Sequence, residues 1–156
     1  MKTSGSGLKV VARLRGGKLI KGYVEAFPIT DFDELIQKDP WTLPLQMGIR
    51  SAESSETLSV PLNTLKALFF VRSFNGSKDY EEVKFFEKNP PIRGLWVQVK
   101  FYDNEFIEGV VRNSLHYLVD PGFFLKPPDP KGNNEILYVI KESLAAFHVL
   151  GAREEY

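Results

Sequence analysis

The sequence predicts an all-β protein made of two tandem five-stranded small barrels joined by a short, partly helical linker. Three observations support this fold class. Apolar residues recur with a period of two at the start of each half, which is typical of half-buried strands. Two similar blocks of sequence align within the 156 residues, and both copies have a glycine at the same place. We therefore expect barrels at residues 8–74 and 95–151, with the linker at 75–94.

Each half is predicted to open with a hairpin. Residues 8–15 and 95–102 align without gaps at a shift of 87 residues, and apolar side chains occupy every second position in both. Tight turns follow at residues 15–18 and 102–105, where Gly, Asn and Asp tolerate the positive φ that such turns need.

The second predicted strand of each half contains a central glycine, Gly22 or Gly109, between apolar neighbours. A glycine inside a strand weakens it and usually marks a sharp bend or a close approach of another backbone. The same glycine in both copies predicts the same bend twice.

The other strands follow from short apolar runs bounded by turn residues. The ends of the two halves align at a shift of 79 residues, so the first half carries eight extra residues, and it has an insertion at 28–40. In this insertion, residues 30–34 are predicted to cap a short helical turn. The centre of the linker, 79–87, is predicted to form one or two helical turns. The remaining strands are expected at 43–49, 56–60, 65–74, 123–126, 135–140 and 144–150.

Composition excludes several classes of protein. The chain has no cysteine, so disulfides, thiolate metal sites and cysteine nucleophiles are absent. No run of about 18 apolar residues predicts a membrane span, and the polar start has no signal-peptide pattern. We expect a cytoplasmic protein.

Twenty basic and twenty acidic residues give zero net charge, but residues 1–27 hold six basic residues against Glu25 alone.

The order of strands and turns resembles the small barrels of the Sm-like and SH3-like proteins. Residues 14–27 resemble the first Sm motif, with a turn glycine and a mid-strand glycine at its spacing. The run at 123–125 and the Asn133-Asn134 turn before Tyr138 add to the likeness. The chain is similar to an uncharacterised bacterial family of duplicated Sm-like barrels.

The residues with which Sm proteins bind uridine-rich RNA do not carry over. The resemblance implies an Asp and an Asn in the loop after the second strand, but Phe27-Pro28 and Ser114-Leu115 stand there. The last turn also lacks the expected basic residue and glycine. The resemblance therefore implies the barrel and leaves the RNA site unsupported.

The sharpest candidate site is a group of basic residues near the N-terminus. A stripe of cations on one two-stranded surface could contact phosphates, with an affinity that falls as salt rises. The alternative is a solvated face balanced by acids of the other copy or of the linker, and we favour it. The candidate nucleic-acid-binding residues are Lys9, Arg13, Arg15, Lys18 and Lys21.

Two aromatic residues and one histidine form a second candidate, an interface. Trp96 and Tyr102 fall on the polar side of their strand, and the first copy has Lys9 and Arg15 at the equivalent positions. Stacking on bases is one use of such residues, and a cation–π contact between barrels is the one we favour. His148 replaces a phenylalanine of the first copy, so packing or an interface is favoured over catalysis.

No catalytic motif is present, and we expect neither enzymatic activity nor a metal or other cofactor. His116 and His148 are the only histidines, and without cysteine they give a weak metal signal. The sequence favours a non-enzymatic binding or adaptor protein that acts on a protein partner or self-associates, because small barrels expose edge strands. The alternative is RNA binding through the basic residues.

Overall fold

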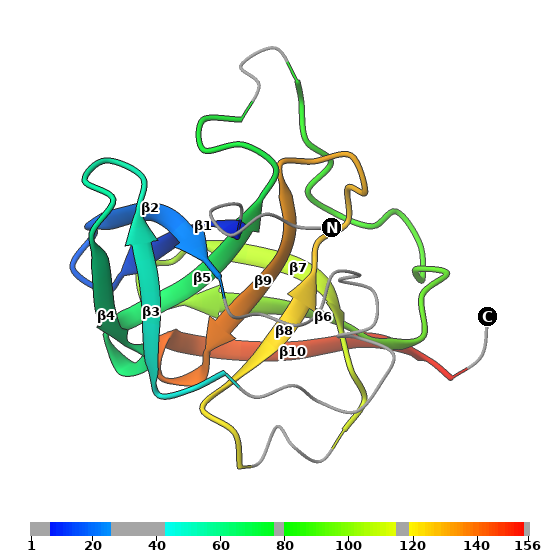
Figure 1. Ribbon diagram of the computed structural model, residues 1–156. Helices are drawn as coiled ribbons and strands as arrows, with labels where there is room; N and C mark the ends of the chain where they lie inside the picture. Colours follow the sequence, from blue (N-terminus) through cyan, green and yellow to red (C-terminus); the bar gives the residue numbers. More distant parts are fainter. Residues whose placement is uncertain (1–6, 26–42, 77–79, 115–118, 155–156) are drawn as a thin grey trace.

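The computed structural model describes residues 7–25, 43–76, 80–114 and 119–154, and these residues form a mainly β structure (Figure 1). One antiparallel sheet holds all ten strands, in the order β10-β6-β7-β8-β9-β5-β1-β2-β3-β4. Two single-turn 3₁₀ helices, η1 (Leu62–Thr64) and η3 (Lys141–Ser143), precede the last strand of each half. The strands are β1 (Leu8–Leu14), β2 (Leu19–Val24), β3 (Gln46–Ser51), β4 (Thr57–Pro61), β5 (Leu65–Val71), β6 (Gly94–Phe101), β7 (Phe106–Val111), β8 (Gly122–Lys126), β9 (Asn134–Ile140) and β10 (Leu144–Arg153).

The mainly β class is confirmed, but the expectation of two separate closed barrels is wrong. The sheet is open and continuous, because β5 of the first half pairs with β9 of the second half. Figure 1 shows these two strands side by side in the middle of the molecule. The physical reason lies in β5, whose seven residues are all buried. A strand that is apolar on both faces needs packing on both faces, which one small barrel alone does not supply.

The two halves nevertheless pair their strands in the same way. Val10 faces Gly22 in β1–β2, and Val97 faces Gly109 in β6–β7. Val10 also faces Phe70, as Val97 faces Val149, and each of these ladders shifts register where the last strand of its half begins. The pairing scheme is therefore repeated, with the shifts of 87 and 79 residues found in the sequence.

Each of the two hydrophobic clusters draws on both halves. In β5, Leu68 and Phe70 belong to one cluster, while the alternate residues Ala67, Phe69 and Val71 belong to the other. Strand β9 divides in the same way, with Tyr138 and its alternate neighbours in the first cluster and Val139 in the second. The two central strands thus join the cores instead of separating them.

Gly22 and Gly109 lie against the third strand of their own half. A Cβ at Gly22 would overlap the carbonyl oxygen of Arg50, and a Cβ at Gly109 would overlap that of Lys126. Arg50 pairs with Tyr23, and Lys126 pairs with Val110, so each glycine directly precedes the residue that pairs with this carbonyl's residue. Glycine is required at both places because the third strand approaches the second too closely for a side chain.

The connector between the halves differs from the expectation. Residues 80–93 contain no helix, although one or two helical turns were expected at 79–87. Two buried carboxylates bind backbone N–H groups that a helix would use for itself: Asp129 accepts from Val83 at 2.9 Å, and Glu108 accepts from Phe86 at 2.7 Å. These bonds tie the connector to β7 and to the loop before β9.

Two further expectations concern the insertion of the first half and the start of its third strand. The helical turn expected at 30–34 lies outside the described residues. Strand β3 begins at Gln46, later than the expected residue 43, although Leu43 is buried in the first cluster. None of the described residues belongs to a helix of the length and apolar character needed to span a membrane.

Candidate functional site

The outward face of β1, where the basic residues were expected, packs against the second half of the chain. Val11 lies between Lys9 and Arg13 on this face, and it is buried with Phe69 in the second cluster. The guanidinium of Arg13 lies 4.8 Å from the ring centroid of Phe69, and its Nη1 atom is 3.8 Å from Glu105. Arg13 therefore contacts an acid of the second half.

Two other basic residues bind groups of their own chain. Lys9 donates to the carbonyl oxygen of Arg72 at 3.4 Å, and Lys21 donates to the side-chain oxygen of Asn75 at 3.1 Å. Nε and Nη2 of Arg15 are shielded from solvent. Lys18 is exposed in the first hairpin turn. The five residues thus lie on β1, β2 and the turn between them, and Lys9 and Lys18 are the two that are exposed.

A buried lysine, which the sequence analysis missed, joins the two halves. Lys66 of β5 is 4% exposed, and its ammonium binds Asp103 at 2.8 Å and also Glu105, both in the β6–β7 turn. The ammonium also lies 4.7 Å from the ring centroid of Phe101. A lone lysine in the otherwise apolar run Leu65–Val71 was the available signal, because a buried lysine needs an acidic partner.

The electrostatics of this cluster favour the charged forms. Burial alone would lower the pKa of Lys66, but hydrogen bonds and the charges of Asp103 and Glu105 outweigh burial and raise the pKa above its usual value. The hydrogen bond from Lys66 lowers the pKa of Asp103. The cluster is therefore an ion-paired contact between the two halves.

The expected interface residues occupy three different places. The hydroxyl of Tyr102 donates to the carbonyl oxygen of Arg15 at 2.5 Å, so these two turns meet across the halves. The indole of Trp96 donates to Glu108 at 2.9 Å, and its ring packs edge-on against Phe86 of the connector. His148 is exposed on β10. The structure therefore does not bring the three residues together.

Strand β10 is the most open apolar element among the described residues. It pairs with β6 on one side, and its other side is an edge of the sheet. Phe147 is 40% exposed, Val149 55% and Leu150 46%. Exposed apolar residues on an edge strand favour the addition of another strand, because backbone groups and side chains are both available there.

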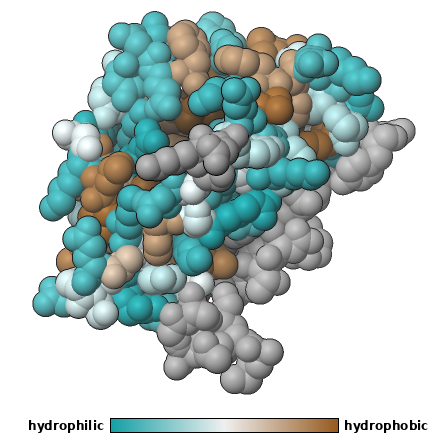
Figure 2. Space-filling model, turned by 90° about the horizontal axis from the view of Figure 1, so that it is seen from above, coloured by the Kyte–Doolittle hydropathy of each residue, from teal (hydrophilic) through white to brown (hydrophobic). Residues whose placement is uncertain are grey.

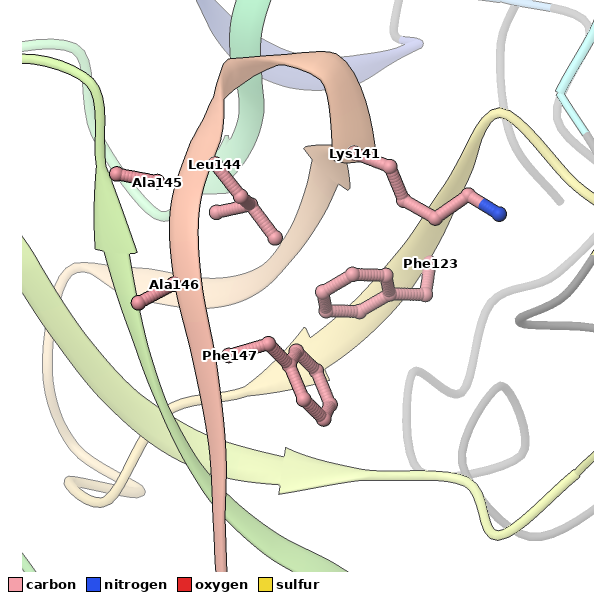
Figure 3. Close-up of a pocket in the computed structure, with 6 residues that line it drawn as sticks. All are labelled: Phe123, Lys141, Leu144, Ala145, Ala146 and Phe147. Carbon is pink, nitrogen blue, oxygen red and sulfur yellow. The ribbon is translucent and has the colours of Figure 1, made fainter.

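A pocket lies at the start of this strand (Figure 3). Its volume is about 380 Å³, and its lining is almost entirely apolar. The rings of Phe123 and Phe147 meet edge-to-face at 5.6 Å, while the amine of Lys141 points away from them at the rim. The lining residues are Phe123, Lys141, Leu144, Ala145, Ala146 and Phe147.

On the face shown in Figure 2, brown apolar areas are small and separated by hydrophilic side chains. Within the described ranges, no group of three His, Asp or Glu residues could hold a metal ion. His116, the other histidine, lies outside the described residues. The edge of β10 and its pocket form the candidate site.

Comparison with known proteins gives a family and no function. The model of one protein family matches residues 6–151, which is nearly the whole chain. The chain belongs to the family of unknown function DUF6982. No curated protein and no solved structure matches the chain. The candidate site of this DUF6982 member therefore rests on its own geometry.

Proposed function

We propose that this DUF6982 protein is a non-enzymatic binding or adaptor protein, that it acts in the cytoplasm through protein–protein contacts, and that β10 is its docking edge. The observation that carries the proposal is that no residue of this ten-residue strand is buried, although it carries the apolar side chains Phe147, Val149 and Leu150. Phe147 also lines an apolar pocket at the start of the strand. Apolar edge strands that remain exposed promote aggregation unless a partner covers them.

We further propose that the two halves are tandem copies of one small Sm-like unit of bacterial origin. The repeated strand order, the repeated registers and the two glycines against the third strands support it. In this view the chain is a fused pair whose units share the β5–β9 ladder, and β10 is the last strand of the second unit.

RNA binding through the basic residues is the second candidate, and the exposed Lys18 and the half-exposed Arg13 favour it. A series of salt concentrations with single-stranded RNA tests it. A steep loss of affinity with salt, abolished in Arg13→Glu and Arg15→Glu, would support RNA binding. Absence of binding at low salt would remove it.

Site-specific photo-crosslinking in the producing cells tests the protein-binding proposal. A photoreactive residue at His148 is expected to yield a protein adduct, while the same residue at Ser59, on the opposite edge strand β4, yields none. Coexpressed wild-type protein without the photoreactive residue should compete for the adduct, and a coexpressed Val149→Asp variant should not. Equal adducts at both positions, or none at His148, would overturn the proposal. An adduct with nucleic acid at Lys18 would favour the second candidate.

A further inference from the structure

We infer that β10 binds an extended segment of a partner protein as an additional antiparallel strand, and that this segment carries an aromatic and a branched aliphatic side chain two residues apart. This inference rests on the proposed function and names the kind of partner. Its basis is a junction within the same molecule, where β9 covers the strand that corresponds to β10.

Strand β5 occupies in the first half the position that β10 occupies in the second. Phe70 faces Val10 of β1, and Val149 faces Val97 of β6, its counterpart. On its other side β5 pairs with β9, so that Leu68 faces Tyr138 and Phe70 faces Ile136. Strand β10 has this second side at the edge of the sheet.

The junction shows what covers such a strand. Leu68 is 0% exposed and Phe70 1%, and both share a cluster with Tyr138 and Ile136. Their counterparts on β10, Phe147 and Val149, are 40% and 55% exposed. Strand β5 is therefore buried beside β9, whereas the corresponding strand β10, at the edge of the sheet, is half exposed.

The register of β5–β9 transfers directly to a strand on β10. The residue opposite Phe147 takes the place of Tyr138, and the residue opposite Val149 takes the place of Ile136. A further apolar residue, in the place of Ile140, would lie toward the pocket at the start of β10 (Figure 3). Alternate side chains of an added strand point to one face, so these three would act together.

A second copy of the chain is a poorer occupant than a partner of this chemistry. Strand β4 is the other edge of the sheet, and it corresponds to β9. It carries Thr57 and Ser59 where β9 carries Ile136 and Tyr138. These short polar side chains would leave Val149 and the pocket uncovered.

Peptide binding to the full chain tests the inference. The probe is a labelled synthetic peptide with the sequence of residues 133–141, extended by two lysines for solubility. The matched peptide has serine in place of Tyr138 and threonine in place of Ile136, which makes it resemble β4. We expect saturable binding of the first peptide and at least a tenfold loss of affinity with the second.

Two protein variants locate the site. Val149→Asp is expected to lower the affinity at least tenfold, while Leu19→Asp is expected to leave it unchanged, because Leu19 is similarly exposed at 48% but lies on β2. Circular dichroism and thermal midpoints check that both variants fold. The paired peptides keep the test valid if Val149→Asp does not fold, because they leave the protein unchanged.

Three results would overturn the inference. These are no binding of the probe, equal binding of both peptides, and equal losses with the two protein variants. Concentration-dependent self-association that Ser59→Lys abolishes would also overturn it, by assigning β10 to a second copy. A protein adduct at His148 without peptide binding would leave the proposed function standing and reject strand addition alone.

Discussion

Strands β5 and β10 hold the same position in the two halves and have opposite environments. Both pair with the first strand of their own half in the same register. All seven residues of β5 are buried, and none of the ten residues of β10 is. Because the pairing on one side is shared, the difference comes from the other side, where β5 has β9 and β10 has the edge of the sheet. Burial here is a property of the neighbour more than of the strand.

The largest expected effect comes from truncating counterpart residues in the two strands. Phe70→Ala removes a side chain that is 1% exposed, and we expect a loss of about 3–5 kcal/mol in the free energy of unfolding. Val149→Ala changes a residue that is 55% exposed, and we expect a loss within about 0.5 kcal/mol. Urea unfolding measures both. Equal losses would show that β10 is covered in solution.

A smaller loss of stability is expected at the two strand glycines, and it tests whether the second and third strands approach each other alike in both halves. Gly22→Ala and Gly109→Ala each place a Cβ on a carbonyl oxygen of the third strand. We expect each substitution to lower the free energy of unfolding, measured by urea unfolding, by about 2 kcal/mol. Gly16→Ala is the matched control, because nothing lies within 4 Å of its Cβ position. A loss at only one of the two strand glycines would mean that the halves differ at this approach.

The aromatic residue that covers β5 gives a pH dependence. Burial, together with the negative charge of Asp120, raises the pKa of Tyr138 to about 12, above its ordinary value of 10.0. The folded state therefore favours the neutral phenol, and stability is full below pH 10 and falls as the pH rises toward 12. We expect the contribution of this group to fall by about 1 kcal/mol at pH 11.

Tyr138→Phe isolates this contribution from other groups that titrate in alkali. Urea unfolding at pH 8 and pH 11 should show a smaller loss in the variant than in the wild type. Lys66, whose pKa is raised, is present in both proteins and titrates alike in them. The difference between the two proteins therefore reports the phenol of Tyr138. Equal losses in the two proteins would contradict burial of the phenol at the junction.

Much of the local structure was predictable, because it follows from patterns of a few residues. Alternation at 95–102 predicted a half-buried strand, and Val97, Val99 and Phe101 are indeed 0% exposed. The hairpin turns and the central glycines also lie where the sequence placed them. The β5–β9 pairing was not predicted, because it joins segments about 70 residues apart. The apolar run Leu65–Val71 held the only signal, since a strand buried on both faces reads as continuous hydrophobicity.

The helical expectation for the connector and the candidate site failed for related reasons. Helix propensity at 79–87 is a weak preference, and carboxylates from β7 and from the loop before β9 override it by binding Val83 and Phe86. The basic pattern predicted an outward face on β1, but the second half covers that face around Val11. Exposure of β10 follows from the strand order, which single-sequence patterns do not contain.

The smallest expected effect concerns the contact between halves at Arg13. Its guanidinium is 3.8 Å from Glu105, and both side chains are more than 40% exposed, so solvent screens the pair. A double-mutant cycle with Arg13→Gln and Glu105→Gln should give a coupling of about 0.5 kcal/mol, falling in high salt. A coupling that persists at 1 M salt would show that the pair is more buried in solution. The joint between the halves would then depend on ion pairs as much as on the apolar cover that separates β5 from β10.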